Sequence, residues 1–199
     1  MNKKPKSSAQ NSNIFYIDPE NPDFLQIEKA ADIVKKGGML LFPTRTLYGI
    51  GVDAFNPDAV NRVFKIKQRA TDSPLSVLVK SINDVTSLAA EIPSAALKFM
   101  ETFWPGSLTI VFKARPEVPS GLTAGTGKIG IRIPEHPVAV RLVESLDCPL
   151  TGTSANLSGH PGADCIEDLP SEIITGVDLV IDSGKLKGGT GSTVVDVTT

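Results

Sequence analysis

The sequence predicts a single compact α/β domain in which helices alternate with strands. Three observations support this fold class. Apolar residues recur at helical spacing in several segments, short apolar runs lie between those segments, and glycine or proline marks most boundaries. A chain of 199 residues, 41% of them hydrophobic, can bury one full core but has little room for a second. We therefore expect residues 13–199 to form one domain.

The first part of that domain is expected to contain two helices and a strand. Residues 23–36 carry four apolar residues on one helical face, and two glycines that can cap the helix follow. Residues 39–42 are predicted to form a buried strand and residues 44–51 a loop. Asn56 has the character of an N-cap, with a proline after it, and this second helix is expected to end at Lys67.

The remaining elements follow the same alternation. A Pro-Gly turn precedes one of the strands, a glycine-rich stretch precedes the last, and a proline opens the final helix. Helices are expected at residues 81–90, 94–103 and 137–146, and strands at residues 75–79, 108–112, 129–133, 177–181 and 193–197.

Composition excludes several classes of protein. The net charge of −2 gives no general attraction to nucleic acid, so an RNA contact would need a local basic patch. Residues 1–12 are polar, with three lysines and no apolar core, and are expected to be a disordered start rather than a secretory signal. No run is long enough to span a bilayer. Cys148 and Cys165 lack metal or redox spacing. We expect a cytoplasmic protein without membrane contact.

Two cations follow the second predicted helix. Lys67 continues an apolar stripe, and Arg69 follows two positions later. An ammonium and a planar guanidinium together can neutralise a polyphosphate, the guanidinium with bidentate geometry. The alternative is a solvated helix end that interacts with the helix dipole.

Two polar loops and one charged strand residue complete the candidate site. Thr46 lies in a segment that follows a buried strand, where open α/β sheets bind ligands, although a tight turn would also explain it. Ser154 and Asn156 can bind phosphate or ribose, or can simply cap a turn. Arg132 lies within an apolar strand and needs a partner. That partner is either a ligand carboxylate or a salt bridge to Glu135 or Glu144.

Taken together, these motifs resemble the YrdC-like family, the threonylcarbamoyl-AMP synthases that begin synthesis of the threonylcarbamoyl-adenosine (t6A) of tRNA. The resemblance rests on PTRTLYGIG at residues 43–51, the Lys-x-Arg that ends at Arg69, IRIPEHP at 131–137, SAN at 154–156 and STVVD at 192–196. It implies a twisted mixed sheet flanked by helices, with a concave basic cleft.

The resemblance also implies roles for individual residues. It makes Lys67 and Arg69 catalytic, and we expect the side chains of Lys67 and Asn156 to face a solvent-filled cleft. The implied ATP-binding residues are Lys67, Arg69, Ser73, Ser154 and Asn156, and the implied threonine-binding residues are Thr46, Arg132 and Ser192.

The implied chemistry needs no covalent enzyme intermediate. L-Threonine and bicarbonate or CO2 give a carbamate, which attacks the α-phosphorus of ATP and expels pyrophosphate, so the enzyme mainly positions the reactants and neutralises charge. Mg2+ is expected to arrive with ATP. The implied partners are separate threonylcarbamoyl-transferase proteins and tRNA or double-stranded RNA.

Two other functions stay open. The stretch at residues 15–22 resembles the YciO branch, Arg45 stands where relatives usually have an acidic residue, and Leu78 stands where archaeal relatives have a histidine. These departures favour a paralogue with altered substrate use. A non-catalytic module that binds structured RNA in a basic cleft is the other alternative.

Overall fold

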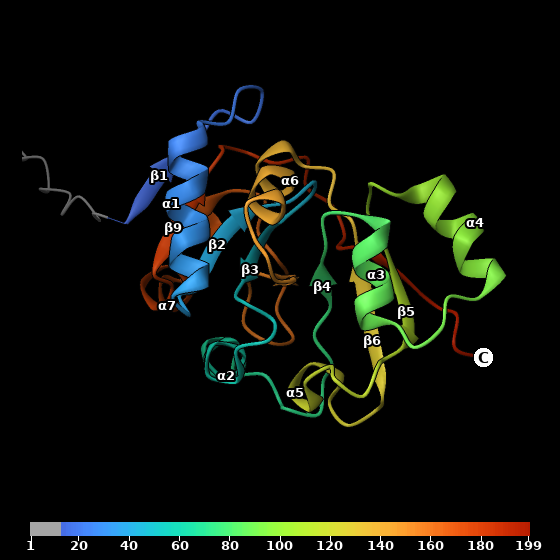
Figure 1. Ribbon diagram of the computed structural model, residues 1–199. Coiled ribbons are helices and arrows are strands. Elements are labelled where there is room, and N and C mark those ends of the chain that lie inside the picture. The colour runs from blue at the N-terminus through green and yellow to red at the C-terminus, as the bar shows by residue number, and fades with distance from the viewer. Residues whose placement is uncertain (1–12) are drawn as a thin grey trace, which may run out of the picture.

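The computed structural model describes residues 13–199, so the predicted disorder of residues 1–12 lies outside the described residues. Within the described part, the strands form two five-stranded mixed sheets flanked by helices (Figure 1). The single α/β domain with a mixed sheet is thereby confirmed, with its strands divided between two sheets. No helix in residues 13–199 is long and apolar enough to cross a membrane.

The first sheet has the order β1-β9-β2-β3-β8. The β1–β9 and β9–β2 pairs are parallel, whereas β2–β3 and β3–β8 are antiparallel. Its strands are β1 (Ile14–Tyr16), β9 (Leu179–Asp182), β2 (Leu40–Pro43), β3 (Tyr48–Gly51) and β8 (Thr153–Ser154).

The second sheet has the order β10-β5-β6-β4-β7. Here β10–β5 and β6–β4 are parallel, and β5–β6 and β4–β7 are antiparallel. Its strands are β10 (Thr193–Asp196), β5 (Leu108–Lys113), β6 (Lys128–Arg132), β4 (Val77–Leu78) and β7 (Leu150–Thr151).

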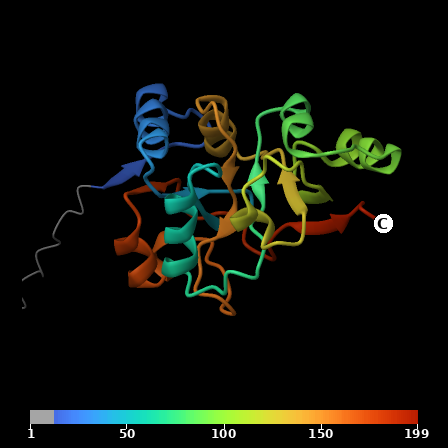
Figure 2. The same ribbon diagram turned by 60° about the horizontal axis from the view of Figure 1, so that its bottom comes forward.

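Helices cover the sheets on two sides. Figure 2 shows α1, α6, α3 and α4 along one side of the strands, with α2 and α7 on the other. The first two pack together and bury Ile27, Val34, Val138 and Leu142 in one apolar cluster with strand residues of the first sheet. The helices are α1 (Phe24–Lys35), α2 (Pro57–Ile66), α3 (Ile82–Leu88), α4 (Ser94–Phe103), α5 (Ser120–Thr123), α6 (Pro137–Glu144) and α7 (Ser171–Gly176), and a 3-10 turn spans Ile166–Asp168.

The expected loop at residues 44–51 is wrong in its second half. Tyr48–Gly51 is strand β3, fully buried and paired with β2. Gly49 and Gly51 have no positive φ. Gly51 is required instead by packing, because a Cβ there would lie 2.8 Å from Cε1 of Phe42 and 2.9 Å from Cγ of Leu150. Glycine thus marked a close approach between strands rather than a turn.

One short segment passes directly from one sheet to the other. Strands β7 and β8 belong to different sheets and are separated by Gly152 alone. The Thr151 backbone N–H donates to the Val52 carbonyl at 2.9 Å, and the Gly152 N–H donates to the Ser76 carbonyl at 2.8 Å. A Cβ on Gly152 would lie 3.0 Å from Cγ of Leu78. The chain therefore passes between the sheets where little room is left for a side chain.

Helix α2 ends in a way that separates the two cations that follow it. The N–H of Arg69 donates to the Phe64 carbonyl at 2.9 Å, and the N–H of Gln68 donates to the Lys65 carbonyl at 3.1 Å. These two bonds form a Schellman motif. Gln68 takes the left-handed conformation, with φ of 49°. The reversal at Gln68 turns the chain between Lys67 and Arg69.

We predict that Gln68→Gly stabilises the protein. Gln68 is exposed and left-handed, a conformation in which Cβ is strained and glycine is not. After the entropy of glycine in the unfolded chain is subtracted, we expect a gain of about 0.5–1 kcal/mol. Urea unfolding of Gln68→Gly and Gln68→Ala measures it. If the alanine variant were as stable as the glycine variant, the assigned strain would be refuted.

Candidate functional site

Strand β6 has one face in the apolar core and the other at the candidate site. Lys128, Gly130 and Arg132 alternate with Ile129 and Ile131, so the first three share one face of the strand. The two isoleucines are fully buried in the apolar core. The opposite face is left to the polar residues, which line two cavities.

The larger cavity has a volume of about 520 Å³ and contains two cationic side chains, Arg69 and Lys128. Among residues 13–199, no carboxylate side chain lines it. Gly130 forms part of it, and a Cβ there would lie 3.1 Å from Cγ2 of Thr109. The lining residues are Arg69, Pro74, Leu75, Ser76, Thr109, Val111, Thr126, Lys128, Gly130, Gly152, Thr153, Ser192 and Val194.

A smaller cavity of about 60 Å³ adjoins the first and contains Arg132. The two cavities share Gly152, Thr153 and Ser192. They therefore meet at the segment that joins the two sheets. The smaller cavity is lined by Phe42, Thr44, Thr46, Leu47, Tyr48, Gly49, Arg132, Gly152, Thr153, Ser154, Gly191 and Ser192.

The ammonium of Lys67 holds the segment that follows this joint. Lys67 is only 2% exposed. Its Nζ donates to the Ser154 carbonyl, to the Asn156 carbonyl at 2.9 Å and to Oδ1 of Asn156 at 3.1 Å. All three ammonium donors thus have protein acceptors, which offsets the cost of burying the charge.

The side chain of Asn156 is equally occupied. Its Oδ1 also accepts from the Ser154 hydroxyl, and its Nδ2 donates to the carbonyls of Leu157, at 2.9 Å, and of His160. Asn156 is 9% exposed. The turn interpretation of this asparagine thus describes its contacts in the structure, and residues 154–160 are held as one unit.

The expectation that Lys67 and Asn156 face a solvent-filled cleft is therefore wrong. Lys67 stands at the inward-facing end of α2, where the apolar stripe of the helix carries it into the core, and neither residue lines either cavity. Burial, with the Arg69 charge as a second cause, lowers the pKa of Lys67 to about 8. The ammonium thus stays protonated at pH 7.

Arg69 occupies the position that was expected of both cations. It lines the larger cavity, and its Nη2 donates to the Pro74 carbonyl at 2.9 Å. Its Nε is buried without a hydrogen-bond partner in the described part of the chain. Burial lowers the pKa of Arg69. Because this guanidinium is already partly desolvated, it can bind an anionic ligand at little further cost of desolvation.

Arg132 makes neither of the salt bridges considered from the sequence. Glu135 pairs with Arg45 at 3.0 Å, and Glu144 pairs with Arg141 at 3.1 Å. Within residues 13–199, no ion pair or hydrogen bond engages the Arg132 guanidinium. Burial lowers the pKa of Arg132, partly opposed by Glu135. The side chain is thus open to a ligand.

Thr46 and Ser192 approach the same small cavity from different segments. The Thr46 hydroxyl donates to the Thr190 carbonyl at 3.2 Å, and the Ser192 hydroxyl accepts from that of Thr109 at 2.9 Å. Ser154 also lines this cavity. Ser73 is half-buried beside Pro74 but lines neither cavity. Five of the eight candidate residues thus line the cavities: Arg69, Arg132, Thr46, Ser154 and Ser192. Lys67 and Asn156 lie behind Ser154, to which both are hydrogen-bonded.

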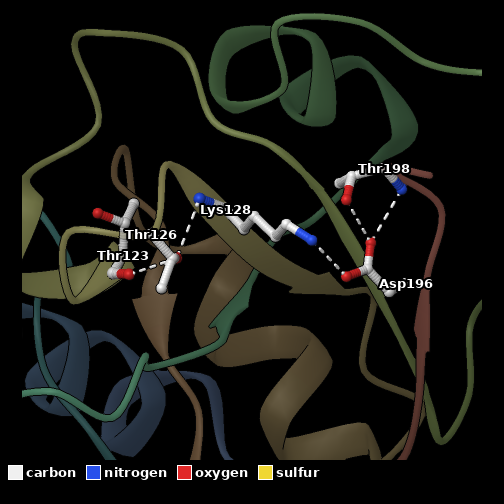
Figure 3. A network of polar contacts seen from close by, with 5 residues as sticks. All are labelled: Thr123, Thr126, Lys128, Asp196 and Thr198. Atoms are coloured by element: carbon white, nitrogen blue, oxygen red, sulfur yellow. Dashed lines mark hydrogen bonds and ion pairs between the residues drawn. The ribbon is translucent and has the colours of Figure 1, made fainter.

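Sequence reasoning missed Lys128 as the second cation of the larger cavity. Figure 3 shows it extended between β6 and the end of the chain, where its Nζ donates to Oδ2 of Asp196 at 2.8 Å. The backbone and hydroxyl of Thr198 also donate to Asp196. These contacts hold the pKa of Asp196 at about 2. The sequence does contain a signal: Lys128 and Arg132 are four residues apart in one strand, so their side chains lie on the same face.

The structural role of Tyr48 was not predicted either, because a residue expected in a loop is not expected to be buried. Its hydroxyl donates to the Gly184 carbonyl at 2.7 Å and accepts from the Ser183 backbone N–H at 3.0 Å. Desolvation raises its pKa. Tyr48 therefore ties the first sheet to the glycine-rich segment that leads to Ser192.

A two-sheet α/β domain with two adjoining cavities, each containing a guanidinium, defines a protein suited to hold two small anionic ligands side by side. A model of the Sua5/YciO/YrdC family, described as telomere recombination, matches residues 32–199. The chain belongs to the Sua5/YciO/YrdC family, which confirms the resemblance seen in its motifs.

Relatives within the family carry two kinds of name. The threonylcarbamoyl-AMP synthase of Pyrococcus abyssi is 35% identical over 173 residues, 87% of this chain and 51% of that protein. The YciO protein of Escherichia coli K12, named as uncharacterized, is 33% identical over 192 residues, 94% of this chain and 91% of that protein. This chain spans about half the length of the synthases of P. abyssi and Bacillus subtilis.

Solved structures of a Sua5 protein and of a YciO protein both resemble this fold. P. abyssi Sua5 in complex with L-threonine superposes with a TM-score of 0.88 at 34% identity, over 92% of this chain and 54% of that one. E. coli YciO superposes with a TM-score of 0.82 at 32% identity, over 94% of this chain and 91% of that one. The fold is therefore shared by the synthase and the YciO branches.

We predict that Lys67→Met destabilises the protein by about 1–3 kcal/mol, because it leaves the Asn156 carbonyl without its donor and takes one of two donors from the Ser154 carbonyl and from Oδ1 of Asn156. Arg69→Met is the matched control and is expected to cost no more than about 1 kcal/mol, since it removes one partly exposed hydrogen bond. Urea unfolding of both variants measures the difference. Equal stabilities would contradict the structural role of Lys67.

Proposed function

We propose that this protein is an L-threonylcarbamoyladenylate synthase, which forms threonylcarbamoyl-AMP and pyrophosphate from L-threonine, bicarbonate or CO2, and ATP. The observation that carries the proposal is the pair of adjoining cavities that meet at Gly152 and Thr153. One has an unpaired guanidinium suited to a carboxylate, and the other has two cations suited to phosphates. The reaction needs such a pair of anion sites in contact.

The smaller cavity is assigned to threonine. Arg132 would pair with the α-carboxylate, since no ion pair or hydrogen bond within residues 13–199 engages its guanidinium. Thr46 and Ser192 supply hydroxyls at the same cavity. The P. abyssi structure with L-threonine supports an amino-acid ligand at the family level.

The larger cavity is assigned to ATP. Arg69 would neutralise the phosphates, an opposite charge at about 4 Å being worth about 4 kcal/mol at an effective dielectric of 20. Lys128 is the second cation of the cavity, and the phosphates would compete with Asp196 for its ammonium. Ser73 and Ser154 stay predicted contacts. Because all three donors of Lys67 are engaged, we propose that Lys67 positions residues 154–156. The role that the resemblance implies, direct contact of its ammonium with ATP, is the alternative that a structure with bound ligands would decide.

The chemistry follows from placing the two ligands together. The threonine amine adds to CO2 and releases a proton, which gives a carbamate. A carbamate oxygen then forms a bond to the α-phosphorus while the bond to the pyrophosphate oxygen breaks. Holding both reactants contributes up to about 7–11 kcal/mol to lowering the barrier in well-oriented cases. The lining of the larger cavity has no carboxylate, so Mg2+ would enter with the phosphates of ATP.

A paralogous activity with another amino acid is the second candidate. It is favoured by the E. coli YciO protein, which matches this chain nearly end to end, and by Arg45, which is adjacent in sequence to Thr46 of the small cavity. Transfer to tRNA by separate threonylcarbamoyl-transferase proteins, and direct contact with tRNA or double-stranded RNA, stay predictions.

We expect pyrophosphate release from MgATP that depends on both L-threonine and bicarbonate. The assay compares threonine, serine, other amino acids and none. Arg132→Gln should raise the KM for threonine about tenfold or more with little change in the KM for ATP, because it loses a charge-assisted contact. Arg69→Gln should do the reverse.

The outcomes separate the candidate functions. Release that requires an amino acid other than threonine would favour the paralogue and overturn the synthase assignment. Absence of release with every amino acid, together with RNA binding that weakens steeply with salt, would favour the RNA-binding alternative.

A further inference from the structure

An ion pair joins the two sheets one residue from Thr46, which lines the small cavity, and both of its partners line a separate cavity of about 650 Å³. Nη1 of Arg45 lies 3.0 Å from Oε1 of Glu135. Arg45 is in the turn between β2 and β3 of the first sheet, next to Thr46, whereas Glu135 follows β6 of the second sheet. The Arg45 and Glu135 side chains are 42% and 32% exposed, so either can move without unfolding its surroundings.

Glu135 has a second cation within electrostatic range. Arg132 lies three residues before it and points into the small cavity, and the negative charge of Glu135 acts on its guanidinium. Glu144, the other carboxylate considered for Arg132, is paired with Arg141. Glu135 is therefore the protein carboxylate best placed to occupy Arg132 in place of a ligand.

We infer that Arg45 is a positioning residue that holds Glu135 away from Arg132, and so keeps the Arg132 guanidinium free for the carboxylate of the amino acid. The inference rests on the proposed function of the small cavity. A tethered carboxylate competes at a high effective concentration. A ligand that must displace it binds with an affinity lowered by the fraction of sites in which Arg132 is already occupied.

Three variants distinguish a positioning role of Arg45 from a merely structural one. Arg45→Ala releases Glu135 and is expected to raise the KM for threonine about tenfold while kcat and the KM for ATP stay nearly unchanged. Glu135→Gln removes the competing charge and should bind threonine about as well as the unaltered protein. The double variant Arg45→Ala/Glu135→Gln should recover the affinity, because no carboxylate remains to occupy Arg132.

Steady-state pyrophosphate release, with calorimetric titration of L-threonine in the presence of MgATP, measures all three. Rescue in the double variant is the result that a merely structural role of Arg45 would not give. An unchanged KM in Arg45→Ala, or a double variant as weak as Arg45→Ala, would overturn the inference and leave the proposed function standing. If the unaltered protein neither binds nor uses threonine, the proposed function fails, and the inference fails with it.

Discussion

The buried ammonium of Lys67 fixes the segment on which both cavities depend. Strands β7 and β8 lie in different sheets with Gly152 between them, and residues 154–156 follow directly. Two backbone carbonyls and the Asn156 amide oxygen accept from the ammonium, so the exit of the chain from this joint has one geometry. A buried charge removed from its acceptors would cost several kcal/mol. The cavities are preorganised because the segment that directly follows their shared residues Gly152 and Thr153 is held by a charge with all its donors satisfied.

The second sheet supplies one cationic side chain to each cavity. Alternation along β6 places Lys128 and Arg132 on the face away from the core, one in each cavity. Gly130 between them has no side chain to fill the cavity. Ile129 and Ile131, on the other face, are buried in the core and hold the strand in place. A single strand thereby sets the distance between the proposed phosphate and carboxylate sites. The cost of ordering these groups is met during folding rather than during the reaction.

Much of the fold could be predicted from sequence, because its helices carry local signals. The N-cap at Asn56 and the glycines after residue 36 are contained within a few residues of the chain. Strand β3 and strand β8, which follows Gly152, were not predicted, since a glycine required by a neighbouring strand looks the same as one required by a turn. For the site, motifs gave the residues but not their directions. Lys67 was expected to face a solvent-filled cleft, because spacing cannot show whether a cation at a helix end turns inward. Only the reversal at Gln68 gives Arg69 a different direction.

The central claim is that the two cavities beside Gly152 hold the two substrates in contact. A crystal structure with L-threonine and a non-hydrolysable ATP analogue tests it most directly. The account predicts the threonine carboxylate on Arg132, the phosphates beside Arg69 and Lys128, and the ammonium of Lys67 still bound to residues 154–156. Ligands bound outside both cavities, or a Lys67 side chain withdrawn from that segment to contact phosphate, would contradict it.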